Sequence, residues 1–318
     1  MVRNKKERIR KGNLFIPLIF SFGAVLEGLP TREFLQDPTK LSNCLRTIQN
    51  YFKVDGVVCY GDTTVLAEAL GCVISSDRYP PAVQPLQELP VDSENWLKEM
   101  VQRGRVPTAI EVIKRLNVLL PDSILLTVTP GPVTLTCQLT GMPASDVLNR
   151  TDLLEISAKA SLLLTKTMGD AGVDLMMIRE KTLPLSDEVS IKKLSRCYAP
   201  LWNTAKFYDL SPLLVIEDFT AEKLDLASKL SGSFVIPADQ LPISVPKGGK
   251  VSLSLPVALL EKEAGEIESF LMSKLVCAGS TSPRLFLVTT DGEIPSEMNR
   301  ERMIRGIEAV RDFLKARA

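Results

Sequence analysis

The chain of 318 residues contains no histidine. Histidine is the usual general base near neutral pH and the commonest metal ligand in proteins. Mechanisms built on a Ser-His pair, on a Cys-His pair or on a zinc ion held by histidine are therefore excluded. Chance loss in a histidine-poor lineage is an equally good explanation of the absence. In either case, the chemistry must rest on carboxylates, Arg, Lys, Tyr, Cys, Ser and Thr, or on a cofactor.

Other absences narrow the class of protein. The six cysteines are scattered without a C-x-x-C pair, which is typical of reduced thiols in a cytosolic protein. The apolar run at residues 14–22 is too short to span a bilayer, and the basic start lacks the features of a secretory signal. Lys+Arg equals Asp+Glu at 38 each, so no global charge points to nucleic acid or to a membrane surface. We therefore expect a cytoplasmic protein without nucleic-acid or membrane partners.

Short apolar runs alternate with longer amphipathic stretches along the whole chain. About eight such alternations, with nearly continuous apolar strands, are the signature of a closed parallel barrel. We predict the α/β class, with a basic N-terminal segment at residues 1–13 and a single (β/α)8 TIM-type barrel domain at residues 14–318. The first strand is expected at residues 15–21, and a long Pro-rich loop at residues 79–90. A doubly wound open sheet is the alternative, but no Gly-rich fingerprint follows the first strand.

Three segments carry a more specific signal. Residues 57–71 read VVCYGDTTVLAEALG, residues 129–141 read TPGPVTLTCQLTG, and residues 291–313 read DGEIPSEMNRERMIRGIEAVRDF. In this order, they resemble the uroporphyrinogen decarboxylase superfamily, which also contains corrinoid and coenzyme M methyltransferases. The resemblance extends from about residue 15 to residue 313, and it implies a (β/α)8 barrel, in agreement with the strand–helix alternation.

The decarboxylase branch of that superfamily has an Arg-rich motif after the first strand, which holds the carboxylates of the substrate. The matching residues here, 20–25, read FSFGAV and contain no arginine. The resemblance places the essential aspartate of this branch at Asp62, which is present, and its tyrosine at Gln138. Only one of the three expected elements remains, which argues against ordinary porphyrin decarboxylation.

The methyltransferase branch binds zinc through a His-x-Cys motif and a later cysteine. The resemblance places these ligands at residues 215–217, which read Val-Ile-Glu, and at Gly292. Because a single carboxylate does not make a zinc site, we expect no metal site here. The Gly-Leu-Pro-x-Arg-Glu-Phe pattern at residues 28–34 and the Glu-Ala-Leu-Gly helix end still bring the chain nearer to this methyltransferase-like branch.

Three acidic residues follow predicted strands, at the end of a barrel where active sites form. These candidate catalytic residues are Asp62, Glu217 and Asp239. Two of them have a simpler explanation: Asp62 as a helix cap, and Glu217 as a solvated loop charge or a cap. Asp291 and Glu293 are expected to complement the dipole of the last helix.

The predicted substrate-binding residues are Ser21, Phe22, Tyr60, Gln138 and Arg179. Arg179 is either an anion clamp or one half of an exposed pair with Glu180. Tyr60 is placed at the mouth of the barrel, and Gln138 is a neutral hydrogen-bonding group. Ser21 and Phe22 make the floor more apolar, which favours a ligand smaller or less anionic than a polycarboxylate porphyrinogen.

The function expected from this resemblance is that of a methyltransferase-like component of corrinoid-dependent one-carbon or demethylation metabolism, without family-type zinc. A small-molecule substrate would bind in the barrel, and a corrinoid would arrive on a partner protein. Two alternatives stay open: a decarboxylase (a lyase) that acts on uroporphyrinogen or a related tetrapyrrole, and a barrel that binds a ligand without catalysis.

Overall fold

The computed structural model describes residues 2–77, 79–88, 93–231, 233–240, 251–276 and 285–317. Within these residues, eight strands pair in parallel and form two groups with the orders β1-β10-β9-β8 and β2-β5-β6-β7. The parallel strands are β1 (Leu14–Phe15), β2 (Gly56–Tyr60), β5 (Ile124–Pro130), β6 (Leu175–Glu180), β7 (Ser211–Ile216), β8 (Val235–Pro237), β9 (Val251–Leu255) and β10 (Leu285–Thr290).

Two contacts join the groups into one ring. A parallel bridge between Leu214 and Phe234 connects β7 to β8. On the other side, the Asp55 N–H donates to the Phe15 carbonyl at 3.2 Å, which brings the end of β1 against the start of β2. The fold is an α/β (β/α)8 barrel, as predicted from the alternation of apolar and amphipathic segments.

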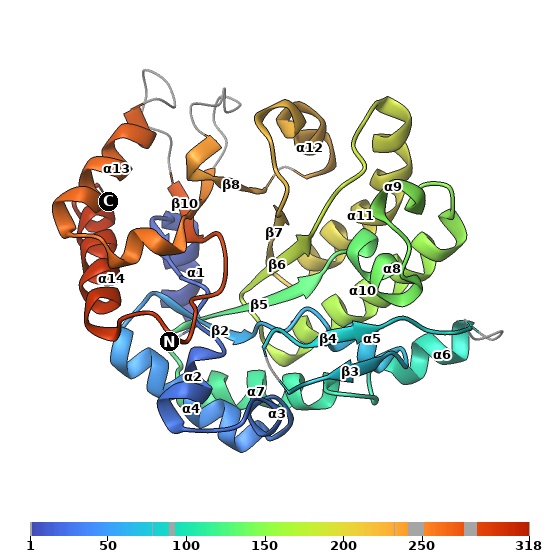
Figure 1. Cartoon of the computed structure of the whole chain (residues 1–318), viewed down its shortest axis with the longest axis horizontal. Helices are drawn as coiled ribbons and strands as arrows, with labels where there is room; N and C mark the ends of the chain where they lie inside the picture. Colours follow the sequence, from blue (N-terminus) through green and yellow to red (C-terminus); the bar gives the residue numbers. More distant parts are fainter. Residues whose placement is uncertain are drawn as a thin grey trace.

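Helices surround the strands (Figure 1). The helices are α1 (Val2–Lys11), α2 (Phe22–Glu27), α3 (Thr31–Gln36), α4 (Pro38–Phe52), α5 (Val65–Ala69), α6 (Ser93–Met100), α7 (Val106–Leu119), α8 (Pro132–Thr140), α9 (Ala144–Val147), α10 (Thr151–Ala171), α11 (Glu188–Phe207), α12 (Leu224–Leu230), α13 (Ala264–Val276) and α14 (Arg300–Lys315). The part of the chain that the structure describes also contains three short 3-10 helices: η1 (Ala221–Lys223), η2 (Ala238–Gln240) and η3 (Val257–Glu261). The apolar core fills the space inside the ring and between strands and helices.

Two expected elements differ from the structure. The strand expected at residues 15–21 is only Leu14–Phe15, and Ser21 already leads into α2. Pro17 interrupts the ladder because it has no N–H, and the Leu18 N–H donates to the Thr290 hydroxyl instead. The Pro-rich stretch is not loop alone: β4 (Ala82–Gln84) pairs antiparallel with β3 (Val73–Ser75) as a hairpin. No helix among the described residues has the length and apolar character needed to cross a membrane.

The basic N-terminal segment packs against the amino-terminal end of the barrel. Lys5 of α1 is buried and lies 3.4 Å from Asp174, which directly precedes β6. Arg8 pairs with Asp55 before β2 at 2.7 Å, and it also donates to the Asp122 carbonyl before β5. Lys5 and Arg8 therefore anchor α1 across the starts of several strands.

Candidate functional site

A large cavity opens at the carboxyl ends of the strands, the end where barrel enzymes hold their substrates. Its volume is about 1330 Å³. Inward-facing Leu18, Val58 and Val128 form an apolar floor. The wall carries the charged side chains Arg179, Lys181, Glu217 and Glu293, and the rim carries Asp77 and Glu297. A cavity with an apolar floor and a few convergent polar groups is suited to a small organic ligand.

Two of the predicted site residues meet in this cavity. Arg179 lies on β6 and Glu217 directly follows the adjacent strand β7. The Arg179 Nε donates to Glu217 Oε1 at 2.7 Å, and both side chains line the cavity. The pairing of Arg179 with Glu180, which was one of the two sequence hypotheses, is not formed, because successive side chains of a strand point to opposite faces.

Glu293 is a cavity residue that the sequence prediction assigned to a different task. It was expected to complement the dipole of the last helix, but α14 begins only at Arg300 and Glu293 lines the cavity. Its Oε1 accepts a short hydrogen bond from the Ser21 N–H, and the carboxyl group also contacts the Tyr79 hydroxyl. Burial raises the pKa of Glu293, while these hydrogen bonds and the charge of Arg179 oppose part of that rise.

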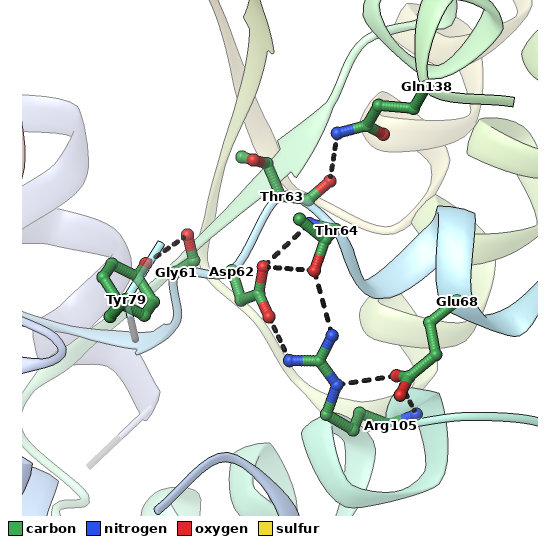
Figure 2. A network of polar contacts seen from close by, with 8 residues as sticks. All are labelled: Gly61, Asp62, Thr63, Thr64, Glu68, Tyr79, Arg105 and Gln138. Carbon is green, nitrogen blue, oxygen red and sulfur yellow. Dashed lines mark hydrogen bonds and ion pairs between the residues drawn. The ribbon is translucent and has the colours of Figure 1, made fainter. Parts of the chain in front are cut away.

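Asp62 does not line the cavity. Its side chain is buried, and its Oδ2 receives a short hydrogen bond from the Arg105 guanidinium (Figure 2). Asp62 Oδ1 accepts from both the N–H and the hydroxyl of Thr64, at 2.8 Å each. Arg105 also donates to Glu68 at 2.6 Å. Asp62 therefore fixes the turn before α5, although the N-cap of that helix is Thr64 and not Asp62. A catalytic role for Asp62 stays a prediction.

The buried network nevertheless shapes the cavity, because it holds the loop that contains Gly61, Thr63 and Thr64, all of which line it. Gln138 Nε2 donates to the Thr63 carbonyl at 3.3 Å, and the Tyr79 hydroxyl donates to the Gly61 carbonyl at 3.1 Å (Figure 2). Gln138 itself lines the cavity, as predicted for its position, and its Oε1 has no hydrogen-bond partner among the described residues.

Three other candidates lie outside the cavity. Phe22 is in the core, with its ring centroid 6.0 Å from that of Phe52. Tyr60 is fully buried against Phe20, and burial raises the pKa of its hydroxyl. Asp239 lies in η2 with an exposed side chain and is not among the cavity residues. Strand ends identify the correct end of the barrel, but an adjacent residue in the chain can face the opposite side.

Glu180 lies on β6 next to Arg179, and its side chain points outward from the barrel. Its carboxylate is fully buried against the first turn of α8, where it accepts from the Val133 N–H at 3.0 Å and from the Thr134 N–H at 2.6 Å. The Tyr198 hydroxyl donates to it as well. Burial raises the pKa of Glu180 to about 7. A Cβ at Gly131 would lie 2.0 Å from Glu180 Oε1, which explains the glycine of the Thr-Pro-Gly-Pro segment.

The cavity does not fit the zinc site that the resemblance implies. Val215 and Gly292 offer no ligand atoms, and Glu217 is paired with Arg179. Among the described residues, no group of three or more His, Cys, Asp or Glu side chains could hold a metal ion. Cys137 lines the cavity, but burial raises its pKa to about 11, so it stays a neutral thiol near neutral pH.

Glu293 and Tyr79 are the functional candidates that sequence reasoning missed. The end of the strand before residue 291 was a usable signal for Glu293, because active sites of barrels form from the loops at the carboxyl ends of the strands. Tyr79 lies between β3 and β4 and follows no barrel strand. Its approach to Gly61 and Glu293 depends on how the hairpin folds back, which has no local signal in the sequence.

Residues 18–193 match the family model of uroporphyrinogen decarboxylase (URO-D), which spans more than half of the chain. The protein therefore belongs to the uroporphyrinogen decarboxylase family, as the three sequence segments indicated. No curated protein sequence matches the chain.

Solved structures with the same fold include methyltransferases. The chain is similar to a methyltransferase from Methanosarcina mazei, with a TM-score of 0.71 and 21% identity over 96% of this chain and 93% of the other. It is also similar to a putative vitamin-B12-independent methionine synthase from Listeria monocytogenes (TM-score 0.53, 11% identity, 96% of each chain). A B12-independent methionine synthase from Shewanella sp. W3-18-1 gives a TM-score of 0.51 at 14% identity over 91% of each chain. These likenesses support the barrel fold of the chain.

Proposed function

We propose that this protein is a methyltransferase-like enzyme of corrinoid-dependent one-carbon or demethylation metabolism, and that it works without family-type zinc. The observation that carries the proposal is the cavity at the carboxyl ends of the strands, where Arg179, Glu217 and Glu293 meet above an apolar floor. A barrel of this family with methyltransferase neighbours and a polar, ligand-sized cavity is suited to small-molecule methyl transfer.

In this proposal the chain's own residues bind and orient a small methyl donor or acceptor. Arg179 and Glu217 provide a fixed charged wall, and Glu293 with Tyr79 provides hydrogen-bonding groups from two other loops. A corrinoid carried by a partner protein would supply the methyl-carrying chemistry when it docks over the open end of the barrel. The scattered free cysteines are in keeping with a cytoplasmic location, which we propose as well.

The decarboxylase alternative receives less support from the site. Asp62, at the position of the essential aspartate of the decarboxylase branch, is bound to Arg105 and Thr64 and does not line the cavity. The cavity has one arginine among its described lining residues, whereas a polycarboxylate porphyrinogen needs several cationic partners.

The test uses the full-length protein under anaerobic conditions with free corrinoids as probes. Methylcobalamin with small thiol or amine acceptors, and cob(I)alamin with methylated amines, ethers and thioethers, are followed by their visible absorption. Methyl transfer that depends on the protein and is lost in Arg179→Gln supports the proposal. Decarboxylation of uroporphyrinogen, read by porphyrin fluorescence and accompanied by no methyl transfer, would contradict it.

A further inference from the structure

The segment that aligns with the family zinc motif faces a guanidinium group in this protein. In the parallel pair β6–β7, Arg179 is directly in register with Val215. Side chains in register on neighbouring strands point to the same face, and so do residues two apart on one strand. Val215 therefore points to the same side as Arg179, and Glu217, which directly follows the strand, lines the cavity together with Arg179. Where the resemblance implies a zinc ion, the positive charge in this protein is the guanidinium group of Arg179.

The other motif segment leads to the same group. Gly292 has no side chain, but its neighbour Glu293 lines the cavity and is electrostatically coupled to Arg179. The Thr290 hydroxyl donates to the Gly292 carbonyl at 2.7 Å, and the Ile294 N–H donates to the Leu18 carbonyl at 2.9 Å, so the loop with Glu293 is fixed on both sides. Arg179 thus lies in the field of two carboxylates that come from the two motif segments.

The guanidinium is only partly used by these neighbours. Its Nε donates to Glu217, and neither Nη atom has a hydrogen-bond partner among the described residues. The Arg179 side chain is 21% exposed and faces the cavity. A guanidinium held at Nε presents its Nη atoms in a planar arrangement that matches the two oxygens of a carboxylate or sulfonate.

We propose that Arg179 binds the anionic head group of a small organic carboxylate or sulfonate, and that Glu217 is the positioning residue that orients it. The remainder of the ligand lies over the apolar floor of Leu18, Val58 and Val128. Glu217 and Glu293 beside Arg179 disfavour a ligand with several anionic groups at this position. The inference rests on the proposed function only in taking the cavity as the substrate site.

The test measures binding and requires no turnover. Benzoate, benzenesulfonate, benzyltrimethylammonium and benzamide share one ring and differ in the charge of the head group. Isothermal titration of the wild-type protein is expected to give tighter binding for the two anions than for the cation or the amide. Arg179→Gln is expected to weaken benzoate binding about 10- to 100-fold, the effect of losing hydrogen bonds between charged groups.

Three variants separate orientation from general charge. Glu217→Gln keeps an oxygen that can accept from Arg179 Nε, so benzoate affinity should stay within about threefold or rise, whereas Glu217→Ala should weaken it. Lys181→Gln removes a positive charge from the exposed wall of the same cavity and should change the affinity less than Arg179→Gln. Thermal unfolding of each variant reports whether it is folded.

The inference is overturned if Arg179→Gln binds benzoate as tightly as the wild type, if benzyltrimethylammonium binds more tightly than benzoate, or if neither anion binds. If Glu217→Gln and Glu217→Ala change the benzoate affinity equally, Glu217 is not a positioning residue. A protein that transfers methyl groups but fails these binding tests would refute this inference and leave the proposed function standing. A protein that binds the anions but transfers no methyl group would refute the proposed function and leave this inference standing.

Discussion

The two ends of the barrel use charged residues in different ways. At the amino-terminal end, Lys5 and Arg8 of α1 pair with Asp174 and Asp55, and Asp55 and Asp174 also accept backbone hydrogen bonds from neighbouring strands. At the carboxyl end, the Nη donors of Arg179 have no partner among the described residues and lie beside a cavity of about 1330 Å³. Charges that are fully paired to the scaffold stabilise the fold, whereas charges with spare hydrogen-bonding capacity at a cavity are available to a ligand.

A network of buried, paired charges lies behind the cavity, so not every charge at the carboxyl end is available to a ligand. Loss of this network should give the largest loss of stability. Arg105→Ala leaves the buried carboxylate of Asp62 without its cation, and we expect a loss of about 3–5 kcal/mol in the free energy of unfolding. Chemical denaturation measures it. The matched control is Arg103→Ala, which breaks an exposed pair with Glu99 and should cost less than about 1 kcal/mol. Similar losses in the two variants would show that the network is not a structural element.

The second-largest effect is the pH dependence of stability that arises from Glu180, on the outward face of β6. The pKa of Glu180 is raised from 4.5 to about 7 in the folded state, so the folded protein holds this proton more tightly than the unfolded chain. The stability that comes from the proton is complete below about pH 4.5 and is lost as the pH rises through about 7. At 1.36 kcal/mol per unit, the loss is about 3 kcal/mol.

The measurement is the free energy of unfolding across this range for the wild type and for Glu180→Gln. The difference between the two proteins should change with pH in that window, because the amide does not titrate. A difference that is constant from pH 4.5 to 7 would contradict the raised pKa. The starting stability of the variant does not matter, since only the slope is compared.

The amino-terminal end should give a smaller loss, and one without an effect on the cavity. Asp55→Ala removes the acceptor for the Phe15 N–H, at 2.9 Å, and the partner of Arg8, and we expect a cost of about 2 kcal/mol. Asp209→Ala breaks the exposed pair with Lys6 and should cost less than about 1 kcal/mol. Urea denaturation measures both. A change in benzoate affinity in Asp55→Ala would contradict the expectation that charges at the amino-terminal end act on stability alone.

The smallest stability effect is expected at the cavity itself. Glu293→Gln keeps a hydrogen-bonding side chain at a half-buried position, so the free energy of unfolding should change by less than about 1 kcal/mol. The affinity for benzoate should rise a few-fold, because a negative charge beside the bound anion is removed. Glu297→Gln, on the exposed rim, is the control and should change the affinity less. A lower affinity in Glu293→Gln would contradict the assignment of an anionic ligand.

The sequence predicted the fold well because the barrel is specified by a repeated local signal. Buried apolar strands such as Ile124–Pro130 alternate with amphipathic helices such as Thr151–Ala171, and both patterns are visible in short windows. The first strand was predicted too long, because the apolar run around Pro17 continues beyond the residues that can form a ladder.

The site was predicted only in part, because the direction of a side chain at a strand end depends on register. Arg179, Glu217, Gln138 and Ser21 line the cavity, whereas Tyr60 and Phe22 are packed in the core. Asp62 was selected from the family resemblance, but its partner Arg105 directly precedes α7, more than forty residues away in the chain. A partner so far away in the chain cannot be predicted from the local sequence pattern.

One paired measurement tests the difference between the two ends most directly: the free energy of unfolding and the affinity for benzoate, each for Arg179→Gln and for Asp55→Ala. We predict that Arg179→Gln loses benzoate binding about 10- to 100-fold with a change in unfolding free energy below about 1 kcal/mol. Asp55→Ala should lose about 2 kcal/mol of stability with unchanged benzoate binding. The opposite pattern, or equal effects of both variants on both quantities, would contradict the assignment of the carboxyl end to ligand binding and of the amino end to folding.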